Sequence, residues 1–178
     1  MEDFIRTVDL CKDFGKTRVL NDININIVPG EVHALVGENG AGKSTLMNVL
    51  FGVHKITSGK IFIDGAEVRI SNPGDARRHG IAMIHQEPLT FPDLTILENI
   101  FAGNIDKAFL DRKTLEKKGQ EILDSLEIPF SLGRKLMGLS VADMQKIEIA
   151  NVLASNARVI FMDEPTASLT PDEVNSLL

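Results

Sequence analysis

The sequence predicts an α/β protein with a parallel central sheet, an antiparallel β portion near its start and a helical portion further along. Two apolar runs, at 81–84 and 159–162, show no alternation, which is typical of parallel strands that are buried on both faces. Runs with a period of two precede the first of them, and amphipathic helical patterns separate it from the second. The chain has 178 residues, which is enough for one such domain with a core of its own.

Composition narrows the range of functions. With 19 Lys and Arg against 25 Asp and Glu, the chain has no overall positive field to attract nucleic acid. The single Cys11 can form no internal disulfide, which favours a reducing compartment. No apolar run approaches the ~18 residues that span a bilayer, and the first residues do not resemble a signal peptide. We therefore expect a chain that neither enters nor crosses a membrane.

The first half is expected to alternate strands and turns before its first helix. Residues 19–28 alternate Ile with Asn, as a half-buried strand does, and Pro29-Gly30 ends that strand in a turn. Segment 31–37 is expected to form a short strand that runs into a glycine loop, with a helix following over 44–52. A hairpin is expected over 60–70, because it contains the dipeptide Asp-Gly between two apolar runs.

Two helices are expected in the second half. Segment 112–128 places its leucines on one face and its charges on the other. Segment 140–154 opens with Ser140 and Asp143 as a capping box and repeats apolar residues near helical spacing. A further helix is expected to start at 170–173, which reads Thr-Pro-Asp-Glu.

The strongest motif lies between the strand at 31–37 and the helix that follows. Residues 37–45 read GENGAGKST and match the phosphate-binding pattern G-x-x-x-x-G-K-S/T in full. The glycines let backbone amides curl around an oxyanion, and the helix N-terminus adds its dipole. Lys43 would place a charge on the β- and γ-phosphates, and Ser44 would offer a hydroxyl to a metal ion. The expected nucleotide-binding residues are Gly37, Glu38, Asn39, Gly40, Ala41, Gly42, Lys43, Ser44 and Thr45. The alternative interpretation is a flexible glycine-rich turn.

A pair of carboxylates follows the apolar run at 159–162. Ligands of a parallel sheet collect at the carboxyl ends of its strands, so Asp163 and Glu164 are expected to face the phosphate loop. Asp163 would hold Mg²⁺, and Glu164 would orient or deprotonate the attacking water. The alternative is a solvated strand end without chemistry.

These motifs, in this order, resemble the nucleotide-binding subunit of ATP-binding-cassette (ABC) transporters over nearly the whole chain. The resemblance implies a P-loop NTPase of the ABC ATPase type, with a RecA-like parallel core, an antiparallel β subdomain and a helical subdomain. We expect a single domain over 1–178, with the β/α core at 1–86 and 157–178 and the helical subdomain at 87–156. The family's switch histidine should lie roughly one βα unit further on, but the last histidine is His85. The domain is therefore expected to be incomplete at its C-terminus.

The resemblance also implies roles for residues outside the two motifs. Gln86 stands where the family has its Q-loop glutamine, which reaches Mg²⁺ and the γ-phosphate. Phe14 stands where an aromatic side chain stacks on adenine, with Phe4 as the competing candidate. Ser168 belongs to the D-loop, which crosses the dimer of cassettes.

The signature of the family is altered in this sequence. The usual L-S-G-G-Q appears as Leu139 followed by Ser140, Val141, Ala142 and Asp143. Both glycines that let amides approach a γ-phosphate are missing, and an acidic residue replaces the glutamine. Like charge near a phosphate is unfavourable, so we expect a weakened or non-catalytic composite site on this face.

The residue pattern of this region indicates a subclass of the ABC family. The pattern LS-x-x-x-MQ-x-IEIA followed by MDEPTASLT is similar to the first half of two-cassette ATPases that import monosaccharides. The resemblance implies an ATP hydrolase that uses ATP and Mg²⁺, with weak or no turnover by the isolated chain. Implied partners are membrane permease subunits, a second cassette beyond Leu178 or in another subunit and, indirectly, an extracellular solute-binding protein. The implied location is cytoplasmic, at the inner face of the cell membrane.

Two alternatives remain open at this point. One is a soluble ABC protein of DNA repair or translation, although the long coiled-coil insertions and basic arms typical of that class are missing. The other is an ATP-binding fragment without turnover.

Overall fold

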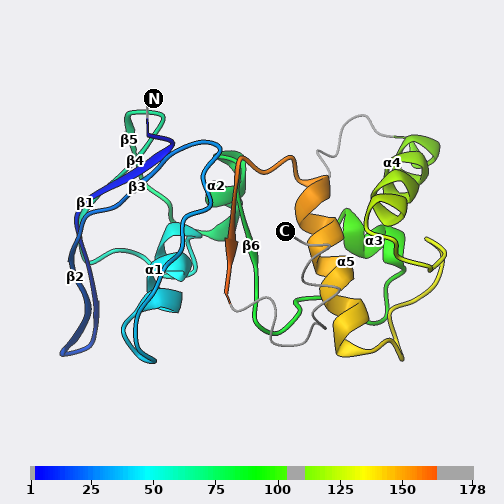
Figure 1. Cartoon of the computed structure of the whole chain (residues 1–178), viewed down its shortest axis with the longest axis horizontal. Helices are drawn as coiled ribbons and strands as arrows, with labels where there is room; N and C mark the ends of the chain where they lie inside the picture. The colour runs from blue at the N-terminus through cyan, green and yellow to red at the C-terminus, as the bar shows by residue number, and fades with distance from the viewer. Residues whose placement is uncertain (1–2, 104–110, 164–178) are drawn as a thin grey trace. The chain divides into compact units, whose positions relative to one another are not determined.

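The computed structural model describes residues 3–103 and 111–163, and it divides the chain into two compact units, Met1–Ile81 and Ala82–Leu178 (Figure 1). The border between the units falls within the strand β6. The sequence groups residues 1–86 with 157–178 instead, and that division into a core and a helical subdomain stays a prediction. The elements are β1 (Ile5–Phe14), β2 (Thr17–Ile23), β3 (Asn26–Ile27), α1 (Lys43–Leu50), β4 (Ser58–Ile63), β5 (Ala66–Val68), α2 (Pro73–Arg78), β6 (Ile81–Ile84), α3 (Ile96–Ile100), α4 (Arg112–Ser125), α5 (Val141–Ala154) and β7 (Val159–Met162).

The first unit is built on an antiparallel sheet with the order β2-β1-β4-β5, in which β3 also pairs with β1. The long strand β1 is central because its first half pairs with β4 and its second half with β2. Ile5 lies opposite Ile63, and both side chains are buried, so this part of the sheet contributes to the core of the unit.

The hairpin β4–β5 confirms the turn expected over 60–70. Ile61 pairs with Val68 and Ile63 with Ala66, so two residues connect the strands. Those residues, Asp64 and Gly65, have φ angles of 49° and 76°. Positive φ at both central residues is the requirement of a tight hairpin turn of the mirror-image type.

The strand expected at 31–37 is wrong in this structure. Residues 31–38 have no regular secondary structure, and no strand of the described part of the chain pairs with them. Val32 and Val36 are 97% and 90% exposed. The physical reason is that a strand exists only with a partner for its backbone N–H and C=O groups, whatever the apolar content of its sequence.

The second unit joins a two-stranded sheet, β6–β7, to three helices. Asp163, just after β7, donates its backbone N–H to the carbonyl oxygen of Ile84, the last residue of β6, at 3.1 Å. The bond joins the carboxyl ends of the two strands, so the strands run in the same direction, as the sequence predicts. All four residues of β6 are buried, as expected for an inner strand.

Helix α5 contacts both the sheet and the other helices of the second unit. On one side it packs Ile149 and Val152 against Ala82 and Ile84 of β6. On the other side it lies beside α3 and α4 (Figure 1). A second apolar cluster joins these three helices, and its buried members are Ile96, Ile100, Phe101, Leu123, Ile128, Leu136, Leu139, Ile147 and Ala150. The hydrophobic effect therefore fixes α5 between two layers.

The helix ends agree with the capping signals in the sequence. Ser140 is the N-cap of α5, and its hydroxyl accepts the N–H of Asp143 at 3.1 Å. Helix α4 begins after Asp111, whose carboxylate accepts the N–H of Thr114 at 2.7 Å. The helix start expected at 170–173 lies outside the described residues. Within the described ranges, no helix combines the length and the apolar character that a bilayer span needs.

Candidate functional site

The glycine loop curls in front of α1, which begins at Lys43. Gly40 and Gly42 have φ angles of 82° and 96°, a conformation that only glycine adopts without strain. The Nζ atom of Lys43 donates to the carbonyl oxygens of Gly37 and Glu38 at 2.7 and 2.9 Å. The side chain of Lys43 therefore joins the end of the loop to its beginning at Gly37 and Glu38.

The surroundings of this loop fit a phosphate group. Within the described part of the chain, no side chain caps the N-terminus of α1, and its first turn holds no acidic residue. The first N–H groups and the positive end of the helix dipole therefore favour an anion. A Cβ atom on Gly42 would lie 3.0 Å from Cδ2 of Leu20 and 3.2 Å from the carbonyl oxygen of Val19, so a larger residue would require the loop or these neighbours to shift by a few tenths of an ångström.

Phe14, the candidate adenine platform, stands at the exposed end of β1. Its side chain is 42% exposed, whereas the competing Phe4 is 3% exposed and belongs to the core. The ring of Phe14 meets His54 edge to face at 5.0 Å between centroids, and Nζ of Lys12 lies 4.7 Å from its centre. Burial thus favours Phe14 over Phe4 as a ligand-facing ring, and its contact with adenine stays a prediction.

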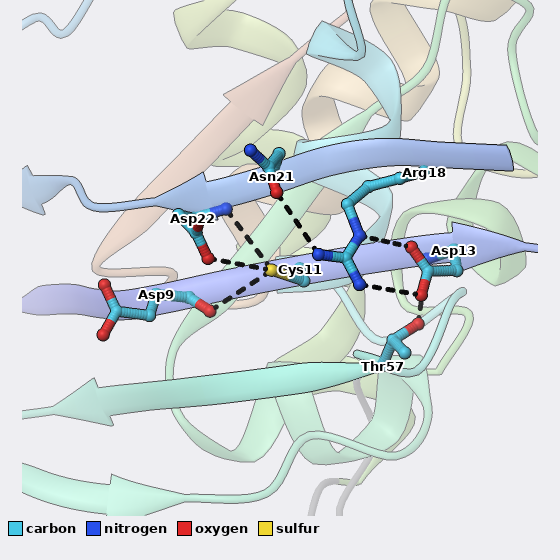
Figure 2. Close-up of polar contacts among 7 residues, drawn as sticks. All are labelled: Asp9, Cys11, Asp13, Arg18, Asn21, Asp22 and Thr57. Carbon is cyan, nitrogen blue, oxygen red and sulfur yellow. Dashed lines mark hydrogen bonds and ion pairs between the residues drawn. The ribbon is translucent and has the colours of Figure 1, made fainter.

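A polar network fixes the strand end that carries Phe14 (Figure 2). Arg18 on β2 donates to both carboxylate oxygens of Asp13, at 2.9 and 3.4 Å, and Asp13 donates its N–H to the hydroxyl of Thr57 at 2.8 Å. The hydrogen bond from Arg18 lowers the pKa of the Asp13 carboxyl. Further along the two strands, Sγ of Cys11 lies 3.3 Å from a carboxylate oxygen of Asp22. These bonds tie β1 to β2 and to the residue before β4.

The structure brings Gln86 and Asp163 to the same edge of the β6–β7 sheet. Gln86 follows β6 by two residues, and Asp163 directly follows β7, so both come after adjacent carboxyl ends. This is the edge at which parallel sheets bind ligands. Glu164 and Ser168, the expected base and D-loop residue, lie outside the described residues.

The altered signature forms the N-terminus of α5. The hydroxyl of Ser140 donates to the carboxylate of Asp143 at 2.6 Å while it accepts the backbone N–H of the same residue. Val141 is 57% exposed. The carboxylate of Asp143 is thus engaged at the helix start, where the sequence leads us to expect a phosphate of another cassette.

Sequence reasoning missed the contact of the partly buried His85 with the buried polar residues Gln145 and Glu148. Glu148 is 5% exposed, and its Oε1 lies 2.7 Å from Nδ1 of His85. The available signal was the charge of Glu148 between Ile147 and Ile149, since an acidic residue in an apolar stretch of helix needs a buried partner.

The phosphate loop before α1 and the parallel strands with polar residues at their carboxyl ends define a P-loop ATP-binding cassette. A family model described as "ABC transporter" matches residues 20–167. The chain belongs to this family.

Solved structures confirm the fold class that the sequence predicts. A nucleotide-free ATP-binding cassette from an ABC transporter superposes on this chain with a TM-score of 0.85 at 28% identity. The superposition covers 99% of this chain and 74% of the chain of that structure. A dimeric cassette in a post-hydrolysis state, bound to ADP and Pi, gives a TM-score of 0.84 at 26% identity. This superposition covers 97% of this chain and 79% of the chain of that structure.

Curated relatives carry a more specific name. Ribose import ATP-binding protein RbsA of Bacillus subtilis (strain 168) is 47% identical over 176 residues, which are 97% of this chain and 36% of that protein. Ribose import ATP-binding protein RbsA 1 of Streptomyces coelicolor is 49% identical over 172 residues, which are 95% of this chain and 34% of that protein. The chain thus spans about a third of the length of these relatives, whose name agrees with the subclass that the signature region indicates.

Proposed function

We propose that this chain is the ATP-binding and ATP-hydrolysing cassette of an importer that carries a monosaccharide, ribose being the sugar in its relatives' names. The observation that carries the ATP part is the loop closed by Lys43 in front of the uncapped N-terminus of α1. The identity of 47% over 97% of the chain supports sugar import. The chain would act in the cytoplasm, on the inner face of the membrane.

The candidate site residues have different roles in ATP binding and hydrolysis. Lys43 and the backbone amides of 37–45 hold the phosphates, and Phe14 stacks on adenine. Ser44, Gln86 and Asp163 would hold Mg²⁺, which supplies positive charge for the oxygens between the β- and γ-phosphates. Glu164 takes the proton of the attacking water or orients that water.

The second unit offers a surface for the permease. Leu89, Phe91 and Met137 are exposed apolar side chains, at 65%, 55% and 63%. The backbone of Phe91 is held by Asn99, whose side chain accepts its N–H at 2.8 Å and donates to its carbonyl oxygen at 3.0 Å. Apolar side chains on a fixed backbone suit a protein partner, and we assign them to the cytoplasmic loops of the permease subunits. A solute-binding protein would act on the far side of the membrane.

One observation favours a second candidate, an ATP-binding chain without turnover at its own signature. The N-terminus of α5 presents the carboxylate of Asp143, held by Ser140, where a phosphate of another cassette is expected. A comparison of ATP binding with ATP turnover separates the two candidates.

The test is the variant Glu164→Gln in the complete protein that carries this chain. The amide keeps the size of the side chain and cannot take a proton, so ATP binding is retained and turnover falls at least ~tenfold. Binding is measured by titration with ATP, and turnover by release of phosphate. Glu121→Gln, an exposed change on α4, is the matched control and leaves both unchanged. Undiminished turnover in Glu164→Gln would remove Glu164 as the base.

A further inference from the structure

A buried polar cluster connects the end of β6 to the middle of α5. We call it the His85 cluster, and it consists of His85, Gln145 and Glu148. Gln145 is 0% exposed and Glu148 is 5% exposed, and the adjacent apolar side chains include Ile84 and Ile149. A low local dielectric strengthens hydrogen bonds within such a cluster.

The cluster holds residue 85 at three points. The backbone N–H of His85 donates to Oε1 of Glu148 at 3.3 Å, and Nδ1 of its ring lies 2.7 Å from the same oxygen. A carboxylate oxygen accepts, so this bond places the ring hydrogen on Nδ1. Nε2 of Gln145 donates to the carbonyl oxygen of His85 at 3.2 Å and to Oε2 of Glu148 at 3.3 Å.

The third contact matters most because of the peptide bond it belongs to. The carbonyl of His85 and the N–H of Gln86 lie in one planar peptide group. Gln145 therefore fixes the plane from which Gln86 departs. A residue of α5 therefore acts on the peptide group that precedes Gln86.

Stability alone is a poor explanation of this cluster. Oε1 of Gln145 is buried and has no hydrogen-bond partner in the described part of the chain. A buried polar group without a partner is unfavourable, and a partly satisfied network is less stable than an apolar core. An apolar side chain of similar size at 145 would avoid that loss but would release the carbonyl of His85.

We propose that the His85 cluster is a positioning device that orients Gln86 toward the Mg²⁺ and γ-phosphate from helix α5. The inference rests on the role given to Gln86 in the proposed function. Helix α5 begins after Ser140, five residues before Gln145, or about 7.5 Å along the helix axis. A shift of α5 at its signature end would therefore reach Gln86 through the hydrogen bond from Gln145 to the carbonyl oxygen of His85.

The first experiment uses Gln145→Leu in the complete protein, assembled with its permease. Loss of one orienting hydrogen bond is expected to lower kcat by about three- to tenfold and to raise the Mg²⁺ concentration for half-maximal turnover. The Kd for ATP without Mg²⁺ stays unchanged, a split between Mg²⁺ dependence and ATP binding that a purely structural role would not give. Glu121→Gln is again the control on an exposed helix face.

A second variant, Glu148→Gln, keeps the proposal testable if Gln145→Leu does not fold. Glu148→Gln keeps the volume and one acceptor for His85, but its amide nitrogen faces the Nε2 donor of Gln145. We expect the same change in kcat and Mg²⁺ dependence, in a smaller degree. Unchanged Mg²⁺ dependence in both variants would overturn the proposal.

Combination with Gln86→Ala separates this inference from the proposed function. If the cluster acts through Gln86, Gln145→Leu has no further effect on kcat in the Gln86→Ala background. Multiplicative effects would overturn the positioning role and leave the role of Gln86 intact. A Gln86→Ala variant with normal turnover and Mg²⁺ dependence would overturn the role of Gln86, and the positioning role with it.

Discussion

Gly42 links the phosphate loop to α1 with a φ of 96°, and a Cβ atom there would make tight contacts with the side chain of Leu20, at 3.0 Å, and the backbone of Val19, at 3.2 Å. A residue with a Cβ is disfavoured there twice, once by the left-handed conformation and once by contact. The shape of the loop that we propose to bind phosphate thus depends on β2, a strand that carries none of the proposed phosphate-binding residues.

Gly42→Ala is therefore expected to weaken ATP binding. The left-handed conformation costs an L-residue about 1–2 kcal/mol, so relaxation of the loop away from it should raise the Kd for ATP about tenfold. Titration calorimetry measures the change. Gly133→Ala is the matched control, because a Cβ there meets nothing within 4 Å. An unaltered Kd in Gly42→Ala would show that the loop tolerates the larger residue.

Among the helices, the short α3 depends most on its first turn. Thr95 and Glu98 form a capping box, in which Glu98 Oε2 accepts the N–H of Thr95 at 2.8 Å and its hydroxyl at 2.7 Å. The hydrogen bond from the backbone of Thr95 lowers the pKa of the Glu98 carboxyl. Because the folded-state pKa is the lower one, the cap stabilises fully above the ordinary value of 4.5 and is lost as pH falls through the folded-state value.

Glu98→Gln should accordingly make the stability toward unfolding depend less on pH in the acid range. The glutamine side chain still accepts from Thr95 but does not titrate, so the urea midpoint should fall less between about pH 5 and pH 3 than in the unaltered protein. Asp111, whose pKa is lowered by the N–H of Thr114, continues to contribute acid sensitivity in both proteins. A slope equal to that of the unaltered protein would count against the capping box as a titrating element.

Elements with short-range signals are the ones that the sequence predicts well. The Asp64-Gly65 turn and the Ser140 cap depend on residues within three positions of one another, and both are present. The His85 cluster joins residues 63 positions apart, so the local sequence indicates that Glu148 needs a partner but not which residue the partner is. Segment 31–37 has the apolar content of a strand, but the pairing that would make it one is not local either.

At the scale of the whole molecule, we expect the altered signature to limit how many ATP sites a pair of cassettes can use. The order of the motifs predicts the fold and the family, because each motif marks one element of the cassette. The placement of the phosphate loop opposite Asp163 and Glu164 stays a prediction. It joins distant parts of the chain, and Glu164 lies outside the described residues.

Restoring the signature tests the expected silent site. Val141→Gly combined with Ala142→Gly, in the complete protein, frees backbone amides at the start of α5 to approach a γ-phosphate. If the facing phosphate loop is competent, ATP turnover should rise about tenfold or more, as expected when donors toward a developing charge are restored. Phosphate release at saturating ATP measures it. Unchanged turnover would argue that the facing loop is itself inactive.

Among the described residues, segment 31–36 pairs with no strand, and this has a consequence for aggregation of the chain. Its backbone offers N–H and C=O groups to any passing strand, and its exposed valines add an apolar surface. Such a stretch behaves like an open sheet edge, which is where proteins begin to aggregate. We therefore expect the residues that lead into the phosphate loop to lower the solubility of the isolated chain. If ATP binds that loop, saturating ATP should slow precipitation of the chain.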